Sequence, residues 1–303
     1  MTCRIDVIYK RQIETATCLA ICIIMLYFGK EMKLGALEGI RLSSEILIPT
    51  LFPFLVLSDY WSKNFYIGDK SPLSKLFVCL FHMPSCGILA FISGIICGFP
   101  LGVKVARDLY DDGKIDERQL ITLCGFSNNP SMAFVISGVG LGIFKSFKIG
   151  IILFISCILS AILCGIIFRK NETNFVESGN ILRQKFNLVE SIKSAGLTSI
   201  TISSYVIFFS AIIFALKPIK NSPLLVSTLE LCSAVEIISK ADFGITQKLA
   251  LIAFSLGFSG LSVHMQSFSF MGREVKKSRY LLMKFTQGVL SSIIVLIIKK
   301  AVP

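Results

Sequence analysis

A run of twenty uncharged residues, 149–168, constrains this chain more than any other feature of its sequence. The run reads IGIILFISCILSAILCGIIF and is followed directly by Arg169 and Lys170. A helix of about 20 apolar residues covers the hydrocarbon thickness of a bilayer, and basic residues favour the polar boundary. The segment therefore predicts a membrane-spanning helix, and the rest of the chain has to fold around it.

The composition extends this conclusion to the whole chain of 303 residues. Hydrophobic residues make up 53% and charged residues 17%, and the mean hydropathy is +0.73. Soluble domains carry about 25% charged residues, so a water-soluble fold is excluded, as are a disordered tail and a disulfide scaffold. The cysteines lie mostly in or beside apolar segments, without a Cys-x-x-Cys pair. We expect them to pack as small hydrophobic side chains.

The sequence predicts an all-α, polytopic integral membrane protein with about eight transmembrane helices and some broken or re-entrant segments. A further segment, 224–239, is short for a crossing and carries Glu230 and Glu236. We expect it to be interfacial or re-entrant, because two carboxylates are costly in lipid. The eight expected spans are residues 12–28, 46–60, 76–97, 119–143, 149–168, 195–216, 249–270 and 285–298.

The basic character of the chain fits the same picture. Lysine and arginine outnumber aspartate and glutamate by 31 to 19, which gives a net charge of +12. The cations gather between the apolar segments, notably in 103–118, 169–193 and 271–284. There they orient a membrane protein and contact anionic headgroups. The expected partner is therefore the lipid bilayer, and nucleic-acid binding is not expected.

A weak internal repeat divides the chain. Residues 37–41 resemble 189–193, and Gly98-Phe99-Pro100 occupies the position of Gly260-Leu261-Ser262, with a basic stretch after each. Transporters are often built from such repeats, with the solute site between them, although the identities are few enough to arise by chance. The expected organisation is an N-terminal membrane helix (1–30), a first membrane half (31–170), a polar linker (171–194) and a second membrane half (195–303).

A polar break interrupts the apolar segment 119–143. Ser127-Asn128-Asn129-Pro130-Ser131 lies between two apolar stretches. Asparagine favours the N-cap and proline the first turn of a helix, so Asn129 and Pro130 are expected to start a second half-helix at membrane depth. Asn128, Asn129 and Ser131 are candidates for binding a polar solute there. The alternative is a capped break packed against other helices.

A second group of polar residues lies in 255–269. Ser255, Ser259, Ser262 and Gln266 share one face of a helix by their 4, 3, 4 spacing. Such a stripe lines a cavity or joins helices by hydrogen bonds. We take Ser262, His264 and Gln266 as candidate solute-binding residues, with helix packing as the alternative.

The turn at Gly98, Pro100 and Gly102 has a structural interpretation. Glycine permits close approach or a positive φ, and proline fixes a bend. With Pro130, these residues are expected to shape the backbone; a mobile hinge is the second interpretation. The sequence contains no P-loop, HExxH or GxSxG motif and only two histidines. No catalytic residue, metal site or cofactor is therefore expected, and the chain is not expected to be an enzyme.

Four motifs, in order along the chain, resemble a known family. They are IPTLFPFLVLSDY, SGIICGFPLGVKVARDLYDDGKI, LCGFSNNPSMAFVISGVGLGIF and FSLGFSGLSVHMQ. Together they resemble the YlbJ family of sporulation integral membrane proteins, over residues 35–295. That family is grouped with the nucleoside-transporter/FeoB Gate-domain proteins, which include SpmA and SpmB. The chain departs from the family in its short loops at 61–75 and 217–223.

The resemblance implies a multi-pass protein of the inner or forespore membrane that is required for sporulation. The Gate grouping implies two Gate-like membrane halves that translocate or gate a small polar solute or ion. The alternative function is a non-transporting scaffold that holds other sporulation membrane proteins or further copies of itself. Polar residues at membrane depth favour transport, because a scaffold gains nothing from their cost.

Overall fold

The computed structural model describes residues 15–16, 19–20, 22–23, 26–64, 71–169, 188–216, 222–272 and 275–301. Part of the predicted N-terminal span 12–28 and most of the predicted linker 171–194 lie outside these residues. Within the described part, the secondary structure consists of thirteen α-helices and two π-helices, which confirms the all-α prediction. They are α2 (Gly29–Leu42), η1 (Ser43–Leu47), α3 (Ile48–Asn64), α4 (Pro72–Phe81), α5 (Gly87–Ile96), α6 (Leu101–Asp111), α7 (Glu117–Ser127), η2 (Phe134–Ile143), α8 (Phe147–Phe168), α9 (Leu188–Ala215), α11 (Pro223–Leu229), α12 (Leu231–Lys240), α13 (Ile245–Phe258), α14 (Gly260–Met271) and α15 (Lys277–Ala301).

Four segments of the described chain are long and apolar enough to cross a membrane, and each matches a predicted span. A fifth is counted if Gly29–Leu47 and Leu51–Leu57, which meet at an angle of 56°, form one bent span. Residues 35–44, which carry Glu38 and Arg41 and precede the predicted span 46–60, belong to the first arm of that bend. The four segments are Phe147–Phe168, Leu188–Ala215, Ile245–Met271 and Lys277–Ala301.

Two further predicted spans are each divided between two short helices. Residues 76–97 separate into α4 and α5 around Pro84, and 119–143 separate into α7 and η2 around Pro130. A helix of ten residues is about 15 Å long, half the hydrocarbon thickness. These pieces therefore reach membrane depth only when packed against full-length spans.

The surface of α8 shows which side of a span meets lipid. Ile155, Leu159, Leu163 and Ile167 recur every fourth residue and are exposed. Ser156, Ser160 and Ala161, on the other side, are fully buried. This arrangement is the reverse of a soluble helix, and small residues inside let membrane helices approach closely. The exposed apolar stripe is the lipid-facing surface.

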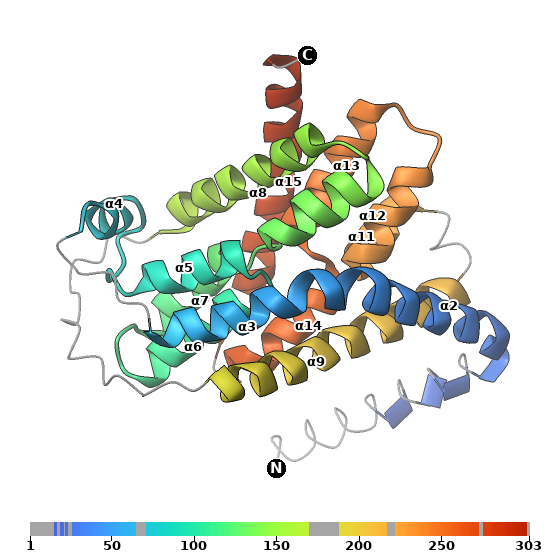
Figure 1. The fold of residues 1–303 in the computed structure, drawn as a ribbon, viewed down its shortest axis with the longest axis horizontal. Helices are drawn as coiled ribbons and strands as arrows, with labels where there is room; N and C mark the ends of the chain where they lie inside the picture. Colours follow the sequence, from blue (N-terminus) through green and yellow to red (C-terminus); the bar gives the residue numbers. More distant parts are fainter. Residues whose placement is uncertain are drawn as a thin grey trace, which may run out of the picture.

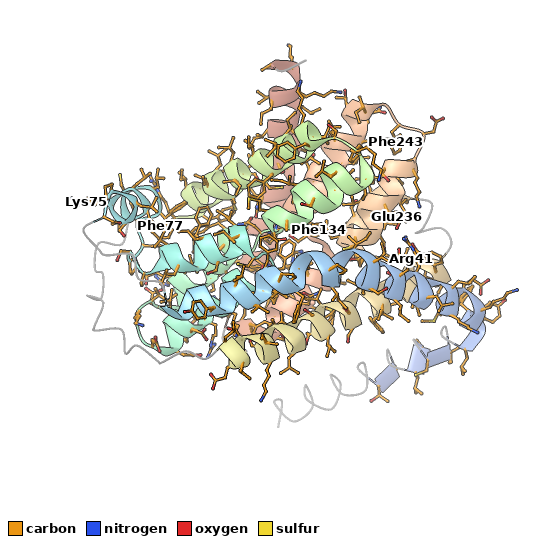
Figure 2. All side chains as sticks on the ribbon, in the orientation of Figure 1. Arg41, Lys75, Phe77, Phe134, Glu236 and Phe243 are labelled. Atoms are coloured by element: carbon orange, nitrogen blue, oxygen red, sulfur yellow. The ribbon has the colours of Figure 1, made fainter. Side chains whose placement is uncertain are left out.

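Helix α15 stands at the centre of the bundle, packed against α13, α8 and α7. In Figure 1 it rises between these helices to the C-terminus, while α2 and α3 lie side by side with α9. Arg41 on α2 reaches Glu236 on α12 with 3.1 Å between Nη2 and Oε1, and Figure 2 shows the two side chains facing each other. This ion pair joins the first bent span to α12.

Candidate functional site

The predicted helix break is present at Asn128–Ser131, between the end of α7 and the helical turn that leads into η2. The capping residue differs from the prediction. Ser131 Oγ, and not Asn129, accepts a hydrogen bond from a backbone N–H of the second arm, that of Phe134, at 3.1 Å. The side chain of Asn129 instead donates to the carbonyl of Phe126 at 2.8 Å. Asn129 therefore satisfies the last turn of α7, which is why it does not start the next helix.

Helix α15 supplies the main partners of this break. Lys284 Nζ donates to the carbonyl oxygen of Asn128 and to Gln287 Oε1, both at 2.6 Å. Gln287 Nε2 in turn donates to Asn129 Oδ1 at 2.7 Å. Lys284 and Gln287 are both fully buried. The ammonium group of Lys284 thus lies beside a freed backbone carbonyl, the position where a transporter with a broken helix can hold a cation.

Nothing in the sequence alone singles out Lys284 as a site residue. It ends the basic stretch 271–284, which we expected to face headgroups and water. The structure corrects this expectation, because the side chain of Lys284 is buried among α7 and α15. The one sequence feature that could have identified Lys284 is its position on the inner face of a long helix. Several other cations lie in the same basic stretch, so this feature does not distinguish it.

Asn128 and His264 lie on the other side of the break. Asn128 Nδ2 donates to Ser267 Oγ at 2.8 Å and to the Tyr280 hydroxyl at 2.6 Å. The same hydroxyl lies 3.4 Å from His264 Nδ1. Asn128 Oδ1 and His264 Nε2 have no hydrogen-bond partner in the described part of the chain. Most of the polar atoms of this group are therefore occupied by protein partners.

The glycine-rich turn between α5 and α6 packs directly against the break. A Cβ atom on Gly94 or Gly102 would overlap the carbonyl oxygen of Ser127. Gly98 has a φ of +81° and leaves no space for a Cβ beside Ser131. These glycines let two backbones touch, as the structural interpretation of Gly98 and Gly102 predicts. Pro100, between them, is the residue before the first turn of α6.

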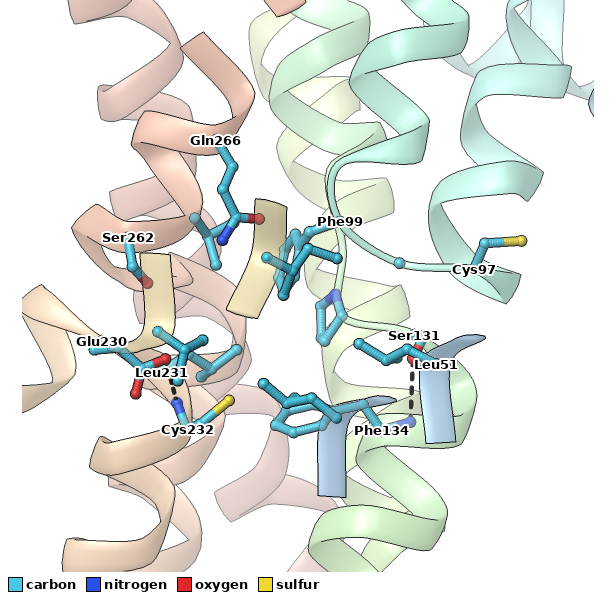
Figure 3. A pocket seen from close by; sticks show the side chains of 16 residues that line it. Leu51, Cys97, Phe99, Ser131, Phe134, Glu230, Leu231, Cys232, Ser262 and Gln266 are labelled. Carbon is cyan, nitrogen blue, oxygen red and sulfur yellow. Dashed lines mark hydrogen bonds between the residues drawn. The ribbon is translucent and has the colours of Figure 1, made fainter. Parts of the chain in front are cut away.

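A pocket lies next to the break, between residues of η1, α3, η2, α9, α12 and α14 (Figure 3). The space available to the centre of a water molecule is about 40 Å³, enough for about three waters. Its wall is mostly apolar, with Leu51, Phe99 and Phe134 on one side. The polar groups at the wall come from Ser131, Glu230, Ser262 and Gln266.

Glu230 is an ionisable residue of the pocket that is absent from the predicted site. It is only 1% exposed and interrupts α11 and α12, where its carboxylate accepts hydrogen bonds from the backbone N–H groups of Cys232 at 2.9 Å and Ser233 at 2.6 Å. A carboxylate is stabilised by such donors at a helix N-terminus. The sequence showed Glu230 only as an obstacle to a crossing, although a Glu before Leu-Cys-Ser in an apolar segment is a possible N-cap.

A further break brings α14 to the pocket. Ser259 and Gly260 have φ values of +83° and +77° between α13 and α14, an interruption that the spacing of the polar stripe did not reveal. A Cβ atom on Gly260 would lie 3.3 Å from the backbone nitrogen of Glu230. The breaks at Glu230 and Ser259 therefore meet. Behind the break, Ser255 is bonded to Ser227 of α11 at 2.8 Å, so the stripe contains both packing and pocket residues.

The structure separates the predicted site residues into two groups. Gly98, Pro130, Ser131, Ser262 and Gln266 line the pocket. The others support the break or the turn beside it; they are Asn128, Asn129, His264, Pro100 and Gly102.

Two side chains of α14 bring polar atoms to the pocket. Ser262 Oγ is buried and makes no hydrogen bond within the described residues. The Gln266 side chain extends toward the interior of the pocket in Figure 3. Within those ranges, no three His, Cys, Asp or Glu side chains gather as a metal cluster would require.

Comparison with known proteins finds one distant homologue. The chain is 22% identical to the sporulation integral membrane protein YlbJ of Bacillus subtilis (strain 168), over 86% of this chain and 76% of that protein. No protein-family model matches the chain, and no solved structure matches it. The similarity therefore extends over most of the length of both chains.

Proposed function

We propose that this chain is a membrane protein of spore formation that translocates or gates a small polar solute or ion across the membrane around the forespore. The sporulation role is supported by the homology to YlbJ. The transport role is supported by one structural observation, the pocket at which helix breaks from both halves of the chain meet.

The depth of the pocket favours transport. Ile202 and Val206 line it, and both lie near the middle of the 28-residue span Leu188–Ala215. The pocket is therefore near the middle of the membrane, far from either surface. Broken helices at this depth are tolerated where they line a cavity, and transporters place their solute sites at such breaks.

The polar groups of the pocket favour transport over a scaffold. A scaffold needs helix surfaces for partners, and it gains nothing from a buried carboxylate and a buried hydroxyl without a partner. Each buried, unsatisfied polar group costs about 1–3 kcal/mol. Ser262 Oγ carries this cost within the described residues, and the buried Glu230 keeps an ionisable carboxyl group in a part of the molecule that is shielded from water. A solute that pairs with them explains why they are there.

The test is replacement of the gene in its own host by a Glu230→Gln variant. We expect normal membrane abundance by immunoblot and far fewer heat-resistant spores, because Gln keeps the shape of the side chain and removes its charge. The matched control is Glu190→Gln, which changes an exposed carboxylate at the start of α9. Normal abundance with normal spores in the Glu230 variant would contradict the transport proposal and favour the scaffold.

A further inference from the structure

The pocket also indicates what kind of solute it takes. We propose that it binds a small inorganic monovalent cation, with Glu230 as the counter-charge and Ser262 and Gln266 as neutral oxygen ligands. This inference rests on the proposed function for its role in transport, whereas the binding itself can be measured without any transport.

The charge of the pocket is the first argument. Glu230 is the only Asp, Glu, Lys, Arg or His among the residues that line it. No lysine, arginine or histidine of the described chain forms an ion pair with Glu230. Its carboxylate meets the backbone N–H groups and the side chains of Cys232 and Ser233, none of which carries a positive charge. A buried charge that lacks an opposite charge is costly. One positive charge in the pocket would balance it, whereas a divalent cation would leave an excess and an anion would be repelled.

The available ligand atoms are the second argument. Two backbone donors occupy part of the Glu230 carboxylate, and its oxygens have further lone pairs. Ser262 Oγ is unpartnered, and the Gln266 amide supplies a carbonyl oxygen at the same wall. Hard cations prefer such carboxylate, hydroxyl and carbonyl oxygens. The three side chains line the same pocket, Ser262 and Gln266 from α14 and Glu230 from the start of α12, which meets the start of α14 at Gly260.

The size of the pocket is the third argument. Room for about three waters suits a partly dehydrated alkali cation, and the available volume of about 40 Å³ leaves no space for a nucleoside. The other break of the bundle does not need an ion, since Lys284 already places an ammonium group on the carbonyl of Asn128. In the pocket, by contrast, the carboxylate of Glu230 has no positively charged partner among the described residues.

The experiment measures thermal unfolding of the purified full-length protein in detergent. The buffers contain sodium chloride, potassium chloride or choline chloride at equal ionic strength and fixed pH. We expect sodium or potassium to raise the melting temperature over choline, by about 2 °C when the cation is at ten times its Kd. An equal melting temperature in all three salts would overturn the inference.

Two serine variants separate binding from packing. Ser262→Ala removes a hydroxyl without a protein partner, so the melting temperature in choline should stay the same or rise, while the cation-induced increase falls. Ser255→Ala removes the bond to Ser227, so it should lower the melting temperature in every salt and keep the cation-induced increase. An unchanged increase in Ser262→Ala would overturn the assignment of this ligand and of the site.

Glu230→Gln should abolish the increase that the cation produces. If the melting temperature of the wild-type protein changes with pH but not with sodium or potassium, a proton takes this position. That result would overturn the cation inference. If no cation binds but Glu230→Gln spores are still defective, the cation inference fails while the proposed function stands. If the wild-type protein binds a cation but Glu230→Gln spores are normal, the cation inference stands and the proposed function fails.

Discussion

Side chains of α14 and α15 hold the break at Asn128–Ser131, and both of its asparagines take part. Four polar residues bond to it, and they are Ser267, Tyr280, Lys284 and Gln287; His264 lies behind Tyr280. Such a network is rigid when its members are paired, and costly when one is removed. At the scale of the residue, the asparagines therefore act on stability.

Replacing Asn129 tests this role. Asn129→Ala leaves Gln287 Nε2 and the carbonyl of Phe126 without their partners, which should cost about 1–3 kcal/mol for each buried group. We expect a lower melting temperature in detergent and reduced membrane abundance. The control is Thr286→Val, which changes a half-buried residue of the same helix α15 whose hydroxyl donates to the carbonyl of Leu282. A stable, abundant Asn129→Ala protein would contradict the structural role of the break.

At the scale of the element, glycine pairs decide which helices touch. On α2, a Cβ atom on Gly35 would lie 2.5 Å from the carbonyl oxygen of Ser210, and one on Gly39 would lie 2.6 Å from the Cα of Ile207. The two glycines are four residues apart, so they form one flat strip along the helix. This strip is where α9 packs in Figure 1.

Filling the strip should separate the two helices. Gly39→Leu cannot be accommodated by rotating a neighbouring side chain, because the backbone of α9 occupies the space. We expect a loss of about 1–3 kcal/mol or more in stability, seen as a lower melting temperature and as protease sensitivity of α2. Gly29→Leu is the matched control on the same helix, since nothing lies within 4 Å of its added Cβ. Equal behaviour of the two variants would refute close packing of α2 on α9.

The elements show what the sequence can predict and what it cannot. Long apolar runs predict α8, α9 and α15 well, because the hydrophobic thickness of the bilayer sets the length of a span. The break at Pro130 is also predictable, because its Asn-Asn-Pro signal is local. Glu230 is not predictable in this way. Its role depends on α14 and η2 lying across from it, and those contacts join residues far apart in the sequence.

At the scale of the whole molecule, the bundle has to present one side of each span to lipid. Leu159 is exposed on α8 while Ala161, two residues later, is fully buried. Lipid tails adapt to a larger side chain, whereas a packed interior does not. The two positions should therefore respond in opposite ways to the same increase in volume.

The pair Leu159→Phe and Ala161→Phe measures this difference. We expect the first variant to keep the melting temperature of the wild type. The second should lose about 1–3 kcal/mol of stability through overpacking. The readout is thermal unfolding of each purified variant in the same detergent. A similar loss in both variants would mean that Leu159 also faces protein, for instance another copy of the chain.

Because Lys284 is buried, its chemical modification can report the separation of α15 from α7. A water-soluble acylating reagent modifies a lysine only when its amine meets solvent, so Lys300, which is exposed near the C-terminus, should react at once. Lys284 is fully buried and should react only in molecules in which α15 has moved away from α7. Peptide mass spectrometry of a labelling time course would give the ratio of the two rates, and equal rates would contradict the burial. A condition that separates α15 from α7 should therefore raise the rate of acylation at Lys284 relative to Lys300.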